Sequence, residues 1–175
     1  MIAYQAPQER PISRRLLADY HTTTLKTWIG GYRNRPEEWT EPKNWYPEGV
    51  PGWSDKVIIG GYGSHCCNIA TGVDDISALS ILPAGKLVIA SAGRLTIDGL
   101  LADPLGMLGD SGLSNAGTLH IQGCLSLRNA ALYGIHNQGT ILNDGHIYAD
   151  DSISCEGFAW GNFEDRGKRV FLSQE

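Results

Sequence analysis

Between residues 57 and 150 the chain alternates hydrophobic with polar positions over short stretches, and glycine separates one stretch from the next. Two apolar residues that flank one polar residue describe a strand of about three or four residues with one buried face. Examples are Leu79/Ile81, Leu87/Ile89, Leu95/Ile97, Leu119/Ile121 and Leu125/Leu127. No helical periodicity intervenes, so the pattern predicts an all-β fold built from very short strands.

A repeat runs through this region. Residues 112–125 align with residues 134–147 at an offset of 22, with glycine on glycine at three positions. In this alignment Asn115 falls on Asn137. A fixed period of this length is the sequence signature of repeat architectures, and it leaves room for about three short strands in each unit.

Backbone chemistry predicts how the units are arranged. A unit of three short strands cannot satisfy its own N–H and C=O groups, so it has to pair in parallel with the units above and below, about 4.8 Å away. Residues 57–150 hold roughly four such units, which predicts a short parallel β-helix. Equivalent residues then form columns, and Asn115 over Asn137 is predicted to be a stacked amide ladder.

A second alignment extends the repeat towards the N-terminus. Residues 93–101 align with residues 117–125 at an offset of 24, and the extra residues are assigned to a loop at 102–110. This alignment puts Asp98 and Asp144 in one column, two layers or about 9.6 Å apart.

That column raises the question of catalysis, because inverting glycosidases hold two carboxyl groups roughly 6.5–9.5 Å apart. Asp98, Gln122 and Asp144 each precede a glycine, however, and Asp-Gly is favoured at a tight corner on its own account. Basic residues, which a polysaccharide lyase needs beside its acids, are sparse between residues 57 and 150. We therefore expect backbone corners here, and no catalytic residue is predicted.

The ends of the chain differ in composition from its middle. Residues 27–56 hold four of the five tryptophans among prolines and glycines, which predicts an aromatic entry cap rather than a helix or a long strand. A stack exposes its core at both ends and needs lids. We expect residues 151–175 to close the other end, with Phe158, Trp160 and Phe163 as the lid.

Residues 1–26 carry a net charge of +2, while the remaining chain carries −7. Prolines in this segment predict an extended backbone. It is either a disordered tail or an arm that lies on an acidic neighbouring subunit, with Arg10, Arg14 and Arg15 as the assembly residues.

The composition of the chain restricts the classes of function that it can have. Glycine contributes 22 of 175 residues, and hydrophobic residues make up 42%, so the chain has enough apolar material to fold and many turns. A net charge of −5 argues against nucleic acid as a partner, because phosphate binding needs clustered Lys and Arg. We recognise no export signal and no apolar run long enough for a membrane helix, so membrane insertion is not expected.

Four cysteines leave two questions open: Cys66, Cys67, Cys124 and Cys155. An even number permits two disulfides, and a bridge from the adjacent pair to either of the other two stays open. Cys124 and His146 occupy equivalent positions of the repeat, but the paired spacing of structural zinc sites is missing. No metal and no other cofactor is predicted.

The run from Trp28 to Asp55, followed by the glycine-spaced strands, resembles the entry segment and first coils of parallel β-helix surface proteins. These are the adhesin-like and autotransporter-like passengers of bacteria, whose architecture many phage tail proteins share. The residues that carry the resemblance are Trp28, Trp39, Asn44, Trp45, Pro51 and Asp55. The resemblance implies a right-handed parallel β-helix used for display, adhesion or assembly, and it implies no reaction.

These expectations combine into a non-enzymatic structural or adhesive protein of a surface assembly, on a virion or a cell surface. Its expected partners are copies of itself or structural proteins, and it acts by self-association and attachment. A carbohydrate-binding or polysaccharide-degrading domain is the alternative, since exposed aromatic rings stack on sugars. Trp53 and Tyr62, with Tyr46 and Tyr133, are the candidate sugar platform.

Overall fold

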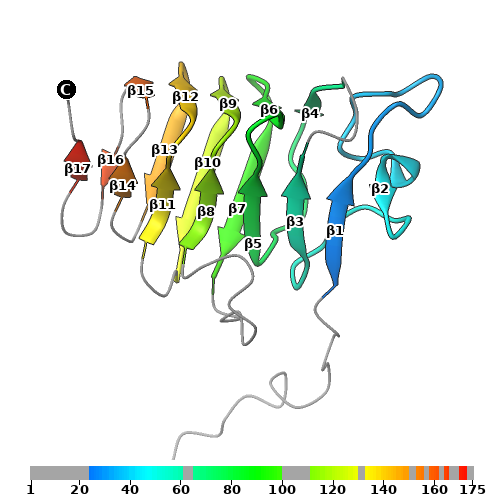
Figure 1. Cartoon of the computed structure of the whole chain (residues 1–175), viewed down its shortest axis with the longest axis horizontal. Helices are drawn as coiled ribbons and strands as arrows, with labels where there is room; N and C mark the ends of the chain where they lie inside the picture. The colour runs from blue at the N-terminus through cyan, green and yellow to red at the C-terminus, as the bar shows by residue number, and fades with distance from the viewer. Residues whose placement is uncertain are drawn as a thin grey trace, which may run out of the picture.

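The computed structural model describes residues 24–60, 65–99, 111–129 and 133–149, and beyond these the backbone of four strands between residues 153 and 172. The described chain is all-β: it is mostly strand, and its one helical element is the short 3-10 turn η2 (Pro42–Asn44). The strands stack side by side along the long axis of the molecule (Figure 1).

The strands form three sheets, which we call A, B and C. Sheet A contains, in spatial order, β17 (Val170–Leu172), β14 (Ile153–Cys155), β11 (Tyr133–Asn137), β8 (Ser111–Asn115), β5 (Ala78–Ile81), β3 (Lys56–Ile59), β1 (Leu25–Trp28) and β2 (Trp45–Tyr46). Sheet B contains β15 (Phe158–Gly161), β12 (Thr140–Asn143), β9 (Thr118–Ile121), β6 (Lys86–Ile89) and β4 (Cys67–Ile69). Sheet C contains β16 (Glu164–Asp165), β13 (His146–Ala149), β10 (Cys124–Arg128) and β7 (Arg94–Asp98).

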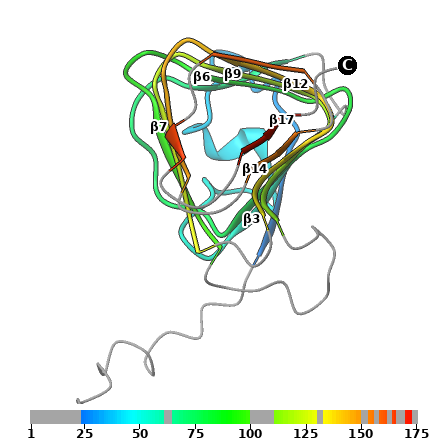
Figure 2. The same cartoon turned by 90° about the vertical axis from the view of Figure 1, so that its left-hand side faces the viewer.

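Every strand pair is parallel except β1 with β2 at one edge of sheet A. From β5 to β17 each strand lies in the next sheet, in the order A, B, C. We call one such passage a circuit. Figure 2 shows the circuits end on, where the three sheets form the sides of a triangular outline.

The predicted offset of 22 is confirmed for the circuits that begin at β8 and β11. In each of the three sheets the paired residues are 22 positions apart: Asn115 and Asn137, Leu119 and Ile141, and Leu125 and Ile147. The glycine-spaced pattern therefore reports the true register in this part of the chain.

The predicted offset of 24 is wrong. Leu95 of β7 lies opposite Leu125 of β10, and Leu87 of β6 lies opposite Leu119 of β9. The longer connection between β7 and β8 lengthens this circuit, so partners are 30 residues apart in sheet C and 32 in sheet B. The sequence pattern failed because strands of all three sheets share the same Leu-x-Ile alternation, which identifies a strand but not its sheet.

The core lies inside the triangle. Along the strands whose side chains are described, from β3 to β13, alternate side chains point inward, as the pleat of a strand requires. The inward side chains are 0–2% exposed, and they include Leu79, Leu87, Leu95, Leu113, Leu119, Leu125, Ile135, Ile141 and Ile147. Burial of each such side chain contributes roughly 1.5–3 kcal/mol. The stack is therefore held by one continuous apolar column.

The stack is longer than predicted at both ends. β1 pairs with β3, so Leu25 and Lys26 belong to the first layer of sheet A and not to the predicted arm of residues 1–26. Strands β14 to β17 extend all three sheets, so the described strands of the predicted closing segment 151–175 continue the stack. The side chains of Phe158 and Trp160, and Phe163 itself, lie outside the described residues.

Candidate assembly site at the N-terminal cap

Three tryptophans close the N-terminal end of the core. Trp28, Trp39 and Trp45 are 0–1% exposed, and Trp45 meets the other two edge to face at centroid distances of 5.0 and 4.7 Å. The indole N–H of Trp45 donates to the carbonyl oxygen of Trp39 at 2.7 Å. Such aromatic pairs contribute about 0.5–1.5 kcal/mol beyond their buried area. The aromatic cap is therefore a packed plug, and η2 lies across the far end of the triangle in Figure 2.

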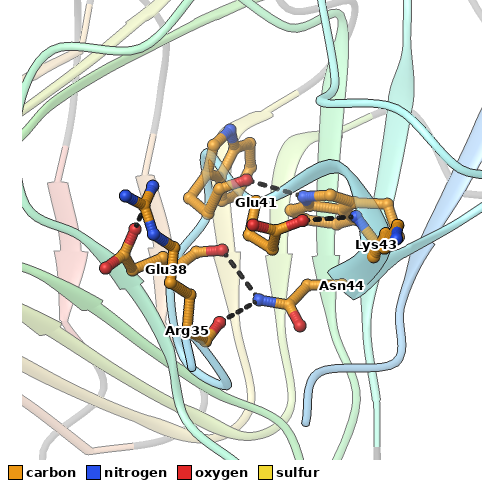
Figure 3. A network of polar contacts seen from close by, with 7 residues as sticks. Arg35, Glu38, Glu41, Lys43 and Asn44 are labelled. Atoms are coloured by element: carbon orange, nitrogen blue, oxygen red, sulfur yellow. Dashed lines mark hydrogen bonds and ion pairs between the residues drawn. The ribbon is translucent and has the colours of Figure 1, made fainter. Parts of the chain in front are cut away.

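Asn44 joins the loops of the cap. It is fully buried at the end of η2, where Pro42 starts the turn and the Glu41 side chain accepts a hydrogen bond from the Lys43 N–H. The Asn44 side-chain amide donates to the carbonyl oxygens of Arg35 at 2.6 Å and Glu38 at 3.0 Å (Figure 3). Its Oδ1 accepts from a backbone N–H of the same loop at 3.0 Å. A buried amide with its groups satisfied holds the loop in one conformation.

Tyr32 supports the outer side of this network. The Lys43 ammonium lies 4.8 Å from the centre of the Tyr32 ring and donates to its hydroxyl at 3.3 Å. That hydrogen bond raises the pKa of Lys43. Arg35 and Glu38 form an ion pair at 3.4 Å beside it. These contacts on the outer side of the cap thus use charged groups that face solvent.

Asp55 and Lys26 fix the segment that leads from β2 to β3. Asp55 Oδ2 accepts from the Gly52 N–H at 2.9 Å, which shapes the turn before β3, and Pro51 is buried beside it. The Lys26 ammonium, 8% exposed, donates to the carbonyl oxygens of Pro47 at 3.0 Å and Glu48 at 3.3 Å. Each residue that carried the resemblance is therefore part of the cap or of its connection to β3.

The outer side of the cap also exposes several large apolar side chains. Tyr46 is 70% exposed, Trp53 52%, Leu25 39% and Val50 36%. Trp53 thus differs from the three buried tryptophans, and it remains a candidate platform. Tyr62 and the assembly residues predicted for the arm, Arg10, Arg14 and Arg15, lie outside the described residues, as does the side chain of Tyr133.

The predicted amide ladder is present between β8 and β11. Asn115 and Asn137 are 0–1% exposed, and the Asn115 amide donates to Asn137 Oδ1 at 2.7 Å. Asn115 also donates to the Thr140 carbonyl at 3.2 Å and accepts from the Gly117 N–H at 3.2 Å. This polar column supports the stack from inside and is not accessible to a ligand.

The carboxylate column considered for glycoside hydrolysis does not exist. Asp98 lies opposite Arg128, and its carboxylate contacts the guanidinium at 3.1 Å. Arg128 also pairs with Asp75 at 2.7 Å. Asp144 instead lies 2.7 Å from His120 Nε2. Sequence reasoning missed these contacts because only the correct register brings such distant residues together.

The cysteines do not bridge in the described part of the chain. Cys66, Cys67 and Cys124 are free thiols, and burial raises the pKa of Cys66 and raises that of Cys67 further. Cys124 lies opposite His146, as the repeat predicted. No group of three or more metal-ligating side chains is found among the described residues.

Searches with this chain match no protein-family model, no curated protein and no solved structure. Within the described residues no helix has the length and hydrophobicity needed to span a membrane.

Proposed function

We propose that the chain is a short right-handed parallel β-helix that serves as a non-enzymatic structural or adhesive component of a surface assembly. The assembly is a virion decoration or fibre, or a fibre or adhesin of a bacterial cell surface. One observation carries the proposal: successive strands pass through three parallel sheets in turn, and partners in consecutive circuits stay in register. Such a stack is a rigid rod whose surface repeats along its length.

The handedness is supported by the view in Figure 2, where the C-terminal end faces the reader. The chain passes from the side with β14 to the side with β12 and then to the side with β7, which is counterclockwise. Because successive circuits approach the reader, this is the right-handed sense. Parallel crossover connections are right-handed in nearly all proteins.

We propose that the rod acts mechanically. Its closed N-terminal end and its flanks make contacts, and the basic arm with Arg10, Arg14 and Arg15 docks on a neighbouring subunit. The charge distribution supports this step, since residues 1–26 are net positive and the rest of the chain is net negative. Localisation on a virion or outside a cell follows from this role.

Removal of the arm tests the proposal. The purified full chain is expected to form oligomers, fibres or lattices in light scattering and electron microscopy, and a variant without residues 1–23 is expected to lose them. That variant keeps Thr24, whose carbonyl accepts from Lys56 N–H, so the first layer remains intact. A triple variant with Arg10, Arg14 and Arg15 changed to Gln distinguishes the effect of the arm's charge on assembly from the effect of its length. A full chain that stays monomeric at all concentrations contradicts the proposal.

Carbohydrate binding is the second candidate, and the half-exposed Trp53 and the exposed Tyr46, both in the cap, favour it. Aromatic rings offer flat apolar faces on which sugar rings stack. A glycan array tests it: binding of one saccharide by the full chain, lost in Trp53→Ala and kept in Leu82→Ala, would support this candidate. Leu82 is a matched control because it is an exposed apolar residue, at 40%, outside the cap.

A further inference from the structure

The two ends of the rod differ in how the edges of the sheets finish. At the N-terminal end of sheet A the outermost strand is β2, which has two residues and runs antiparallel to β1. Pro47, which has no N–H group, follows it directly. Short edge strands followed by proline resist pairing with another strand. Sheet A therefore resists strand addition at this end.

At the same end, segments outside the named strands cover the edges of sheets B and C. Beside β4, the Asn68 N–H donates to the Glu37 carbonyl oxygen at 2.7 Å, and the Trp39 N–H donates to the Asn68 carbonyl oxygen at 3.0 Å. Beside β7, the segment 71–76 exchanges backbone hydrogen bonds with β7 itself. Together with the buried tryptophans, these contacts close the N-terminal end of the rod.

The C-terminal end of the rod presents the outermost strand of each sheet. Sheet A finishes in β17, sheet B in β15 and sheet C in β16, and within the described chain no strand pairs with the outer side of these three. Alternate residues of a strand direct their N–H and C=O groups to opposite sides, so each terminal strand has backbone groups that face outward. Such an edge is a template for the strands of another chain.

The three terminal strands form a ramp. Each strand lies further along the rod than the strand before it, by about one third of the layer spacing of about 4.8 Å. The strand β15 is therefore the innermost of the three, β16 lies between, and β17 is the outermost strand in Figure 1. A partner that pairs with all three strands at once needs strands in the same triangle and a ramp of the same pitch.

A second copy of the chain has such an end, and one two-fold arrangement fits it to the first. With the axis through the side of sheet C, β16 faces β16 of the partner, and β17 faces β15 of the partner. The outermost strand then meets the innermost one, so the three gaps between the copies are equal. An axis through sheet A would bring the two β17 strands together and hold the other strands apart.

The direction of the strands suits this arrangement. A two-fold rotation about an axis perpendicular to the rod reverses the sense in which the strands run around it, so strands that meet across the contact are antiparallel. Antiparallel pairs are slightly more stable per residue than parallel pairs.

We propose that two copies of this chain associate through the C-terminal ends of their rods, by antiparallel pairing of the three terminal strands in this two-fold contact. This inference rests on the proposed function, of which it specifies one contact. Because the N-terminal end is closed, the contact joins two rods and does not propagate, so larger assemblies need the arm or the flanks. The strands have two to four residues each, so the interface is small. A dissociation constant in about the micromolar range follows.

Strand β16 provides a test, because both of its residues are acidic. In this arrangement Glu164 and Asp165 face the same strand of the partner, and like charges on opposing strands are destabilising. Neutralising them is therefore expected to strengthen the contact. A gain in affinity separates the contact from a general loss of folding.

Sedimentation equilibrium on the chain without residues 1–23 measures this dimer after the larger, arm-dependent assemblies are lost. Glu164→Gln/Asp165→Asn is expected to lower the dissociation constant at least about tenfold at low salt, and by less at high salt. Glu48→Gln/Asp74→Asn is the control and should leave the dissociation constant unchanged. It changes the net charge equally, at two exposed positions away from the C-terminal end.

Small-angle X-ray scattering gives the arrangement of the two copies. An end-to-end dimer is expected to be about twice as long as the monomer with the same cross-section, whereas a side-by-side dimer keeps the length. Circular dichroism and the fluorescence of the buried tryptophans check that each variant folds. Glu164→Gln alone serves as the second variant if the double variant unfolds.

The outcomes distinguish this contact from the proposed function. A dissociation constant that is equal in the parent chain and the β16 variants, or a dimer that keeps the monomer's length, overturns the end-to-end contact and leaves the proposed function standing. A full chain that remains monomeric at every concentration overturns both. Dimers of the full chain that disappear when residues 1–23 are removed assign the contact to the arm and also overturn the end-to-end contact.

Discussion

At the scale of single residues, the corners between sheets explain the repeated Asn-x-Gly motif. Asn115 Oδ1 accepts from the N–H of Gly117, and Asn143 Oδ1 accepts from the N–H of Gly145, both at 3.2 Å. An asparagine that bonds its own backbone two residues on makes a tight turn. The following glycine is required because the carbonyl of the previous layer lies where its Cβ would be.

Gly139→Ala tests that requirement. A Cβ at this position would clash with the carbonyl oxygen of Gly117 and with the backbone of Ala116. Because backbone atoms of a packed layer cannot move aside, we expect a loss of about 3 kcal/mol in the free energy of unfolding. Gly72→Ala is the control, since nothing lies within 4 Å of a Cβ there. Chemical denaturation measures both, and equal losses would contradict the close stacking of corners.

Asn137→Ala tests the amide ladder. It removes the acceptor of the Asn115 amide, which stays buried with one N–H unsatisfied. An orphaned buried donor costs about 1–3 kcal/mol. Asn34, which is exposed, provides the control Asn34→Ala, expected to change stability by less than about 0.5 kcal/mol. Similar losses in the two variants would show that the ladder contributes nothing.

The buried thiol of Cys67 lowers the free energy of unfolding at alkaline pH. Burial raises the pKa of its thiol well above that of an unfolded cysteine. As the pH rises above about 8.5, the unfolded chain releases this proton first, so the free energy of unfolding falls by up to about 1.36 kcal/mol per pH unit. Below that pH both states hold the proton, and there is no contribution.

The prediction is that Cys67→Val reduces the fall in stability between pH 8.5 and 10. Ile69→Val, on the same strand, removes buried volume without a titrating group and should keep the wild-type slope. Denaturation curves across this pH range measure both slopes. A Cys67→Val slope equal to that of the wild type would contradict the burial of the thiol.

At the scale of elements, the sequence predicted the short strands and the cap, but it did not predict every strand pairing correctly. Alternation of Leu and Ile with polar residues located the strands, because burial on one face demands it. Which sheet a strand joins depends on the length of each connection, and the same alternation occurs in all three sheets. Asp98 was therefore assigned to the column of Asp144, while its true neighbour is Arg128.

The sequence placed the first and last strands of the stack outside it, for related reasons. Leu25 and Lys26 were placed in the arm because charge was counted there, yet both lie in β1. The segments of β14 and β15 depart from the residues of the central strands, with Cys155 opposite Asn137 and Phe158 opposite Thr140, so they did not match the repeat. The tryptophan cap was recognisable because four tryptophans among prolines and glycines have few other structural roles.

Ion pairs on the outer face of a sheet should add little to stability. Arg128 bridges Asp75 and Asp98 across three layers, but these side chains are 28–46% exposed. We expect Arg128→Gln to lower the free energy of unfolding by less than about 1 kcal/mol, and high salt to abolish the difference. Arg94→Gln, on the same face, is the control. A loss above about 2 kcal/mol would show that outer charges hold the layers together.

At the scale of the whole molecule, the strands of each circuit pair only with the circuits before and after it, so stability is close to a sum over neighbouring layers. The buried column and the closed N-terminal end leave the outer surface for function. That arrangement fits a protein that works by presenting a rigid surface, and it is the reason the proposals concern contacts between molecules.

The register between circuits is the central claim, and a cysteine cross-link tests it most directly. Neighbouring parallel strands lie about 4.8 Å apart, within the Cα separation that a disulfide spans. In His146→Cys and in Arg94→Cys, the new thiol lies opposite the free thiol of Cys124, one layer above or below. Oxidation followed by peptide mass spectrometry should find Cys124 bonded to residue 146 in the first variant and to residue 94 in the second. Absence of both cross-links, or an efficient bond between residues 94 and 118 in an Arg94→Cys/Thr118→Cys variant, would contradict the stack described here.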